Sequence, residues 1–269
     1  MPTPFSSPLL DNEDHWPTRM GGSIPGERVV FRGKDLFQQL NHMGWTGLLL
    51  YGISGREFSD KQIKLFEGMW TISASYPDPR VWNNRVAALA GTAGSTAGLA
   101  ISAALAVSEA NLYGGRPLLK AMDFLTRTQI QIENGSSVEQ CVRTALKKHR
   151  VICGYGRPIV SCDERIQPLM TLAQQLGYDE GKHVKLAFAV EQYLLQNRWR
   201  QRMNIAALCG ALAADQELSK REYYHYMVLC TSAGMFPCFI DSANRSKGHF
   251  MPLRCNRIRY EGKPKRGWT

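Results

Sequence analysis

The sequence predicts an all-α protein, and three observations lead to this fold class. Apolar residues recur at helical spacing in a series of segments along the chain. Glycines, prolines and helix-capping residues separate these segments. Alternating patterns rich in β-branched residues are scarce. With 269 residues, 44% of them hydrophobic, the chain suits one large or two modest domains with a real core.

The first elements follow a polar, proline-rich arm at residues 1–24. This arm lacks the basic start and apolar block of a secretory signal. Residues 28–40 begin as a short β-like run and are expected to turn helical after Gly33, with Asp35 as the helix cap.

The next helices are predicted from caps and breaks. Residues 44–52 are apolar, and Ser59 begins a helix that Pro77 and Pro79 end. Four apolar residues of that helix lie at helical spacing: Ile63, Phe66, Met69 and Trp70.

The segment Val86–Ser108 carries no charge and is long enough to span a bilayer. It consists mostly of Ala, Gly, Ser and Thr, which contribute little to membrane insertion. Small residues also allow close helix packing inside a soluble protein. A single buried helix in a soluble protein is therefore the favoured interpretation.

A break at Leu112–Pro117 precedes the remaining helices. Ser219 is expected to cap the last of them, SKREYYHYMVLCTSAG. The others are predicted at residues 118–132, Val138–His149, about Leu169–Leu176, Val184–Gln196 and Ile205–Ala214.

Charge and cysteine content limit the possible partners. The net charge is +10, and much of the excess lies in the tail Arg254–Trp268. Such tails meet nucleotide phosphates, polycarboxylates or nucleic acid, but no zinc-finger or other nucleic-acid-binding signature favours the last. The seven cysteines form no CxxC pair, and no histidine lies at zinc spacing. We expect reduced thiols in the cytoplasm and no metal site.

Four motifs, in order and at sensible spacing, carry a family resemblance. They are FRGKDLFQQL near the start, LYGGRPLLKAM, GYGRPIVSCDER and NRIRYEG near the end. Across about residues 24–262 the chain resembles the citrate synthase superfamily, which includes the citrate synthase and citryl-CoA lyase types. The length is closer to citryl-CoA lyase and to the corresponding module of ATP-citrate lyase.

The resemblance implies a citrate synthase-like two-domain multihelical fold in a short form. Residues 25–115 and 222–269 would form a large domain that makes a homodimer, with Val86–Ser108 in the interface. Residues 116–221 would form a small domain that closes over the substrate.

The resemblance also implies a set of catalytic positions. The family removes an α-proton from a CoA thioester and stabilises the resulting enolate. Tyr113 and Arg157 stand where the family has two histidines, and Asn204 stands near its catalytic aspartate. Asp78 stands where the family has a further histidine. Arg165 and Arg257 correspond to two arginines of the family, and Arg80 is a further candidate for binding carboxylate or CoA.

Each substitution changes the available chemistry. Tyr113 can still donate a hydrogen bond to a thioester oxygen, whereas Asn204 cannot act as a general base. Arg157 can clamp a carboxylate but cannot shuttle a proton. Asp78 is therefore the candidate base, with a helix-end cap paired to Arg80 as the alternative.

Several of these positions also have a purely structural interpretation. Arg157 would then be an ion-pair partner within the fold, and Tyr113 a packing residue. The NRWRQRM segment around Trp199 is a solvated basic loop or a contact for CoA phosphates. The glycines of the two motifs are expected to serve backbone turns: Gly114, Gly115, Gly154 and Gly156.

Two functions follow from the resemblance. The first is an enzyme that acts on an acyl-CoA thioester and a carboxylate or oxo-acid partner. It would form a C–C bond or cleave one as in citryl-CoA, with a non-standard substrate and no covalently bound cofactor. The alternative is a catalytically inactive protein retained for binding CoA, carboxylates or a protein.

Overall fold

The structure is a computed structural model that describes residues 7–73, 76–111, 114–157, 161–249 and 254–263. Helices dominate these residues, so the all-α prediction is confirmed. The chain forms two compact units, Met1–Glu67 and Gly68–Thr269. The boundaries predicted for a large and a small domain stay predictions.

The first unit contains a small antiparallel sheet in the order β1-β2-β3. Its strands are β1 (Gly21–Ile24), β2 (Arg28–Phe31) and β3 (Lys34–Asp35), followed by α1 (Trp45–Ser54). The helix predicted after Gly33 is wrong, because Gly33 adopts a φ of 83° and turns the chain back into β3. Asp35 caps a turn instead, and its Oδ1 accepts from the backbone N–H groups of Phe37 and Gln38.

Helix α2 (Asp60–Ser73) continues into the second unit. Its predicted start is confirmed, because the Ser59 hydroxyl accepts from the backbone N–H of Gln62.

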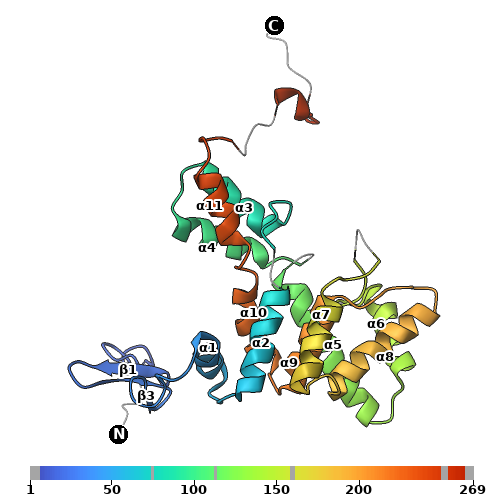
Figure 1. Cartoon of the computed structure of the whole chain (residues 1–269), viewed down its shortest axis with the longest axis horizontal. Coiled ribbons are helices and arrows are strands. Elements are labelled where there is room, and N and C mark those ends of the chain that lie inside the picture. Colours follow the sequence, from blue (N-terminus) through green and yellow to red (C-terminus); the bar gives the residue numbers. More distant parts are fainter. Residues whose placement is uncertain (1–6, 74–75, 112–113, 158–160, 250–253, 264–269) are drawn as a thin grey trace. The chain divides into compact units, whose positions relative to one another are not determined.

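Three helices of the second unit pack together (Figure 1): α3 (Trp82–Thr92), α4 (Ala97–Ser108) and α11 (Met235–Ala243). Ala87, Ala104 and Met235 are buried between them. The single helix predicted over Val86–Ser108 is wrong. It is broken between α3 and α4, where Gly94 has a φ of 76° and Thr96 caps α4. Helix α11 is not predicted, because the sequence pattern places the last helix at Ser219.

The other helices of the second unit surround α9 (Ile205–Asp215), whose residues from Ile205 to Ala214 are all buried. Three of them contact it: α5 (Gly115–Glu133), α8 (Lys182–Gln196) and α10 (Lys220–Cys230). Helix α6 (Val138–His149) packs on α5 and α8, and α7 (Ile166–Leu176) follows it in the chain. Ser137 and Ser219 each form a capping box. The predicted helix positions are confirmed here.

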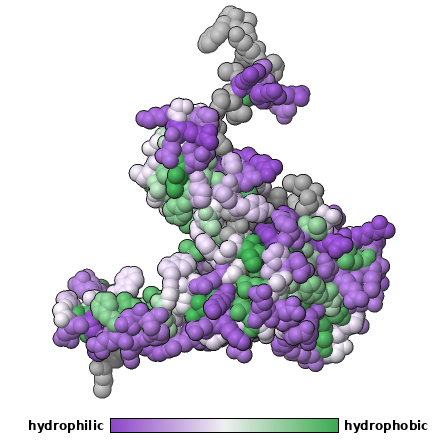
Figure 2. All heavy atoms as spheres, viewed as in Figure 1, coloured by the Kyte–Doolittle hydropathy of each residue, from purple (hydrophilic) through white to green (hydrophobic). Residues whose placement is uncertain are grey.

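One face of this helical group is mainly polar. Hydrophilic side chains cover most of the face seen over α6 and α8 in Figure 2. Among the described helices, none combines the length and the apolar character needed to cross a membrane. The short 3-10 helix Cys255–Arg257 lies near the end of the chain.

Candidate active site

The turn Gly154–Arg157, here called the GYGR turn, is attached to the start of α9. Tyr155 and Met203 form an isolated antiparallel bridge. The backbone N–H of Gly156 donates to the carbonyl of Arg202 at 2.7 Å, and that of Asn204 donates to the carbonyl of Gly154 at 2.8 Å. These bonds fix the turn against a buried helix.

Asn204 adds a side-chain tether to this attachment. Its Nδ2 donates to the carbonyl of Gly156 at 2.9 Å. Its Oδ1 accepts from the backbone N–H of Ala206 at 3.0 Å and caps α9. The amide of Asn204 is thus used to hold the GYGR turn on the helix.

Gly154 is required where the turn contacts two helices. Its φ is +95°, which is unfavourable for a residue with a Cβ. A Cβ at this position would lie 2.7 Å from the Cβ of Ala207 on α9 and 3.1 Å from the Cβ of Ala121 on α5. The turn therefore packs closely on α5 and α9.

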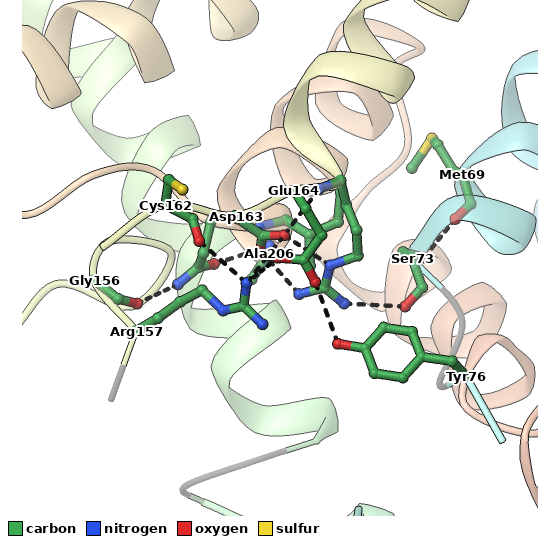
Figure 3. A network of polar contacts seen from close by, with 12 residues as sticks. Met69, Ser73, Tyr76, Gly156, Arg157, Cys162, Asp163, Glu164 and Ala206 are labelled. Carbon is green, nitrogen blue, oxygen red and sulfur yellow. Dashed lines mark hydrogen bonds and ion pairs between the residues drawn. The ribbon is translucent and has the colours of Figure 1, made fainter. Parts of the chain in front are cut away.

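Asp163 is the centre of a polar network beside the turn (Figure 3). Its side chain is fully buried. Arg165 donates to it from Nε at 2.8 Å and from Nη2 at 2.9 Å, and Ile205 donates from its backbone N–H at 2.9 Å. Burial alone would raise the pKa of Asp163, but the hydrogen bonds and charge of Arg165 outweigh it and lower that pKa.

Arg157 pairs with the next carboxylate along the chain. Its Nη1 donates to Oε2 of Glu164 and, at 3.2 Å, to the carbonyl of Cys162. It also lies 3.7 Å from Oδ1 of Asp163. The hydroxyl of Tyr76 donates to the other Glu164 oxygen, Oε1, at 3.4 Å. Glu164 thus links the loop after the turn to the segment that contains Asp78 (Figure 3).

Asp78 is engaged by its neighbour Arg80. Its Oδ1 accepts from the backbone N–H of Arg80 at 2.8 Å, and its Oδ2 lies 2.6 Å from Nη2 of that residue. Hydrogen bonds from Arg80 lower the pKa of Asp78. The Asn84 amide holds this segment by donating to the carbonyls of Tyr76 and Asp78.

Comparison with known proteins identifies the family. Residues 27–235 match the family described as "Citrate synthase, C-terminal domain". The chain belongs to the citrate synthase family. The resemblance indicated by the sequence motifs is therefore confirmed. No curated protein sequence matches the chain.

Solved structures share the citrate synthase fold. Citryl-CoA lyase from Hydrogenobacter thermophilus superposes with a TM-score of 0.82 at 19% identity, over 94% of this chain and 97% of that one. ATP citrate lyase from Methanothrix soehngenii, in complex with citrate and coenzyme A, gives 0.78 at 22% identity, over 98% of this chain and 45% of that one.

Citrate synthase from Thermoplasma acidophilum, in complex with carboxymethyl coenzyme A and oxaloacetate, gives a TM-score of 0.66 at 16% identity. The match covers 84% of this chain and 59% of that one. At these identities the likeness shows the fold.

The structure brings several of the predicted site residues into one region. Arg157 and Arg165 lie against Asp163, which also accepts from Ile205, the residue after Asn204. Tyr76 connects the Asp78 segment to this network through Glu164. Gly114 precedes Gly115, the first residue of α5, and a Cβ on Gly114 would lie 2.0 Å from the carbonyl oxygen of Ser108.

One described residue of the predicted set, Arg257, is not joined to this region. Arg257 lies exposed in the 3-10 helix Cys255–Arg257, and among the described contacts none links it to the GYGR turn. Tyr113 lies outside the described residues. Their predicted roles therefore stay predictions.

Sequence reasoning misses the residues that complete the network. Asp163 and Glu164 stand in the third family motif, but the motif alone assigns them no role. A signal for them exists, because an Asp-Glu pair lies between two arginines in RPIVSCDER. Nothing in the sequence indicates Tyr76, because its contact with Glu164 joins residues 88 positions apart.

A basic cavity of about 640 Å³ adjoins the same chain segments. Four cationic side chains line it with three others: Arg143, Leu146, Lys147, Arg150, Asn197, Arg198 and Trp199. The guanidinium of Arg198 lies 5.2 Å from the centre of the Trp199 ring. The sequence signal is the i,i+4 spacing of Arg143 and Lys147 on one face of α6, followed by Arg150 directly after the helix.

Burial disfavours the thiolate form of two cysteines near the site, Cys209 and Cys153. Burial raises the pKa of Cys209 to about 12, although Arg165 lies close enough to lower it in part. Burial also raises the pKa of Cys153. Within the described ranges, no group of three or more His, Cys, Asp and Glu side chains is arranged to hold a metal ion.

Proposed function

We propose that this citrate synthase-family chain is an enzyme that acts on an acyl-CoA thioester and a carboxylate-bearing partner, forming or cleaving a C–C bond. The observation that carries the proposal is the proximity of two anion-attracting features along the same segments. Arg150 lines the basic cavity four residues before the GYGR turn begins. Trp199 lines it five residues before Asn204, which holds the turn.

The basic cavity suits the nucleotide end of coenzyme A. Its four cations can neutralise phosphate groups, and Trp199 offers an aromatic face for an adenine ring. The GYGR turn and Arg157 suit the reacting end of the thioester and its partner. Arg157 provides a fixed positive charge beside the turn, where a carboxylate or a developing alkoxide can be stabilised.

In the condensation direction, the carboxylate of Asp78 would take the α-proton of the thioester. The enolate carbon would then attack the carbonyl carbon of the partner, and the resulting alkoxide would lie near Arg157. Tyr113 would donate a hydrogen bond to the thioester oxygen. Arg80 is 88% exposed, so it can leave Asp78 at little cost. Asn204 serves the fold and takes no proton.

A second function is favoured by one specific observation. The pKa values of the Asp78, Asp163 and Glu164 carboxyls are all lowered. Arg80 lowers that of Asp78, Arg165 lowers that of Asp163 against the effect of burial, and its own backbone N–H together with Arg157 lowers that of Glu164. A lowered pKa makes a carboxylate a weaker base. The alternative is therefore a catalytically inactive protein that binds CoA and carboxylates.

Product formation tests the proposal. Acyl-CoA thioesters with oxo acids, and citryl-CoA alone, are incubated with the protein and analysed by mass spectrometry. Because general base catalysis contributes about 10²–10⁴-fold, Asp78→Asn should lower turnover by about a hundredfold or more. Tyr113→Phe should lower it less. Asp241→Asn, which removes an exposed carboxylate paired with Arg245, is the control and should keep full turnover.

Two outcomes would contradict the assignment in different ways. Full turnover by both Asp78→Asn and Tyr113→Phe would reject these residue roles. No product from any substrate, by a folded protein that still binds CoA in calorimetry, would favour the inactive binding protein.

A further inference from the structure

The guanidinium of Arg157 is already occupied by a carboxylate of this chain. Nη1 of Arg157 donates to Oε2 of Glu164, and the hydroxyl of Tyr76 donates to Oε1 at 3.4 Å. The Glu164 carboxylate therefore lies between a cation and a hydroxyl, as the carboxylate of a bound ligand would. Figure 3 shows Arg157 and Tyr76 approaching it from two different chain segments.

The two neighbouring acids of this loop differ in how firmly they are held. Asp163 is fully buried and accepts from Arg165 and from the backbone N–H of Ile205. Glu164 has a side chain that is 61% exposed, and its carboxylate accepts from the side chains of Arg157 and Tyr76 and from its own backbone N–H. Asp163 is a fixed part of the fold, whereas Glu164 can rotate into solvent.

We propose that Glu164 is an internal competitor for ligand carboxylates. In the unliganded protein it occupies the site between Arg157 and Tyr76, and a carboxylate of the partner substrate binds there by displacing it. The inference rests on the proposed function in taking a carboxylate-bearing partner as the ligand.

Local charge explains why displacement is required. Arg157 and Arg165 balance Glu164 and Asp163, so the network is neutral as it stands. An additional anion would meet two carboxylates and no unpaired cation of the network. When Glu164 rotates away, the incoming carboxylate restores the same balance. The open state is accessible because exposed ion pairs are weak.

The competitor also favours one class of ligand. A single carboxylate only replaces the contacts that Glu164 already makes, and the tethered group competes at a high effective concentration. A ligand with further carboxylates gains contacts elsewhere that Glu164 cannot match. The site is therefore expected to bind dicarboxylates and tricarboxylates in preference to monocarboxylates such as acetate.

Isothermal titration calorimetry with citrate, as a tricarboxylate probe, tests this inference on the full chain. A ligand that binds only the open state has its affinity reduced by the open fraction. From the usual strength of exposed pairs, Glu164→Gln should bind citrate about two- to sixfold more tightly than the wild type. Arg157→Gln should bind it more weakly.

The matched control is Glu180→Gln. Glu180 is an exposed carboxylate, paired with Lys185 at 2.8 Å, so its replacement changes the net charge equally. Its citrate affinity should equal that of the wild type. Equal affinities of Glu164→Gln and wild type, weaker binding by Glu164→Gln, or no citrate binding by any of these proteins would each overturn the inference.

A structure of the citrate complex gives an independent readout. The inference requires a citrate carboxylate on Nη1 of Arg157, with Glu164 turned away. Citrate bound while Glu164 remains on Arg157 would overturn it. These tests do not depend on turnover, so failure of the proposed C–C chemistry leaves them interpretable. Equally, an active enzyme whose Glu164→Gln variant binds citrate no better would reject only this inference.

Discussion

At the scale of single residues, the candidate site depends on one buried carboxylate. Asp163 accepts two hydrogen bonds from the Arg165 side chain and one from the start of α9. Breaking such a pair leaves a charge in a poorly solvated place. The side chain of Arg165 is only 19% exposed, so water compensates it little.

Asp163→Asn should therefore lower the free energy of unfolding by about 2–4 kcal/mol in urea denaturation. The pKa of Asp163 is lowered in the folded protein. Its stabilising contribution is thus present above the unfolded-state pKa of about 3.9 and is lost as the pH falls through the lower folded-state value. Wild type should lose this stability on acidification, and the variant should not.

The control for this prediction is Asp241→Asn. Asp241 is 64% exposed and forms an i,i+4 pair with Arg245, so it should change stability by less than about 0.5 kcal/mol. Equal stabilities of Asp163→Asn and Asp241→Asn would contradict the role given to Asp163.

At the scale of elements, helix caps and periodicity predict most of the helices, and the failures have physical causes. Ser219 marks α10 because its side chain and Glu222 form a capping box from local sequence alone. The break between α3 and α4 is obscured in the sequence, because Gly, Ser and Thr recur throughout Val86–Ser108 and Gly94 and Thr96 do not stand out among them. Gly91 packs on the carbonyl of Phe239, and this contact with α11 depends on the tertiary fold.

The site illustrates the same division between local and tertiary signals. Arg157 and Asn204 can be found from the sequence because they stand in or near motifs of a known family. The hydrogen-bond partners of these two side chains are not predictable from the sequence. The contacts of Arg157 with Glu164 and of Asn204 with Gly156 depend on loops that folding brings together. Tyr76 reaches Glu164 from a distant segment and leaves no sequence signal.

The side chain of Asn204 is predicted to stabilise the attachment of the GYGR turn to α9. Asn204→Ala removes the cap of α9 and the tether to Gly156, so it should cost about 1–2 kcal/mol in urea denaturation. Asn204→Asp keeps the cap but loses the donor to Gly156, so its smaller loss should report the tether alone. Thr96→Ala, which removes a cap from α4 without a tether, is the control. An Asn204→Ala loss no larger than that of Thr96→Ala would contradict a tethering role.

At the scale of the whole molecule, the family is predictable because four short motifs keep their order over most of the chain. Homodimer formation stays a prediction. Helix α4 leaves the apolar side chains of Leu99 and Val107 exposed, as expected for a helix that a second subunit would cover. Whether the molecule retains catalytic activity depends on the residues that depart from the family motifs.

Measurement of α-proton exchange shows whether the protein forms an enolate. The protein is incubated in deuterated water with a panel of acyl-CoA thioesters, with and without oxo acids, and the acyl groups are weighed by mass spectrometry. An enzyme that forms an enolate should incorporate deuterium into one acyl class, and Asp78→Asn should abolish this exchange. No incorporation across the panel, from a folded protein that binds CoA, would contradict the enzymatic account.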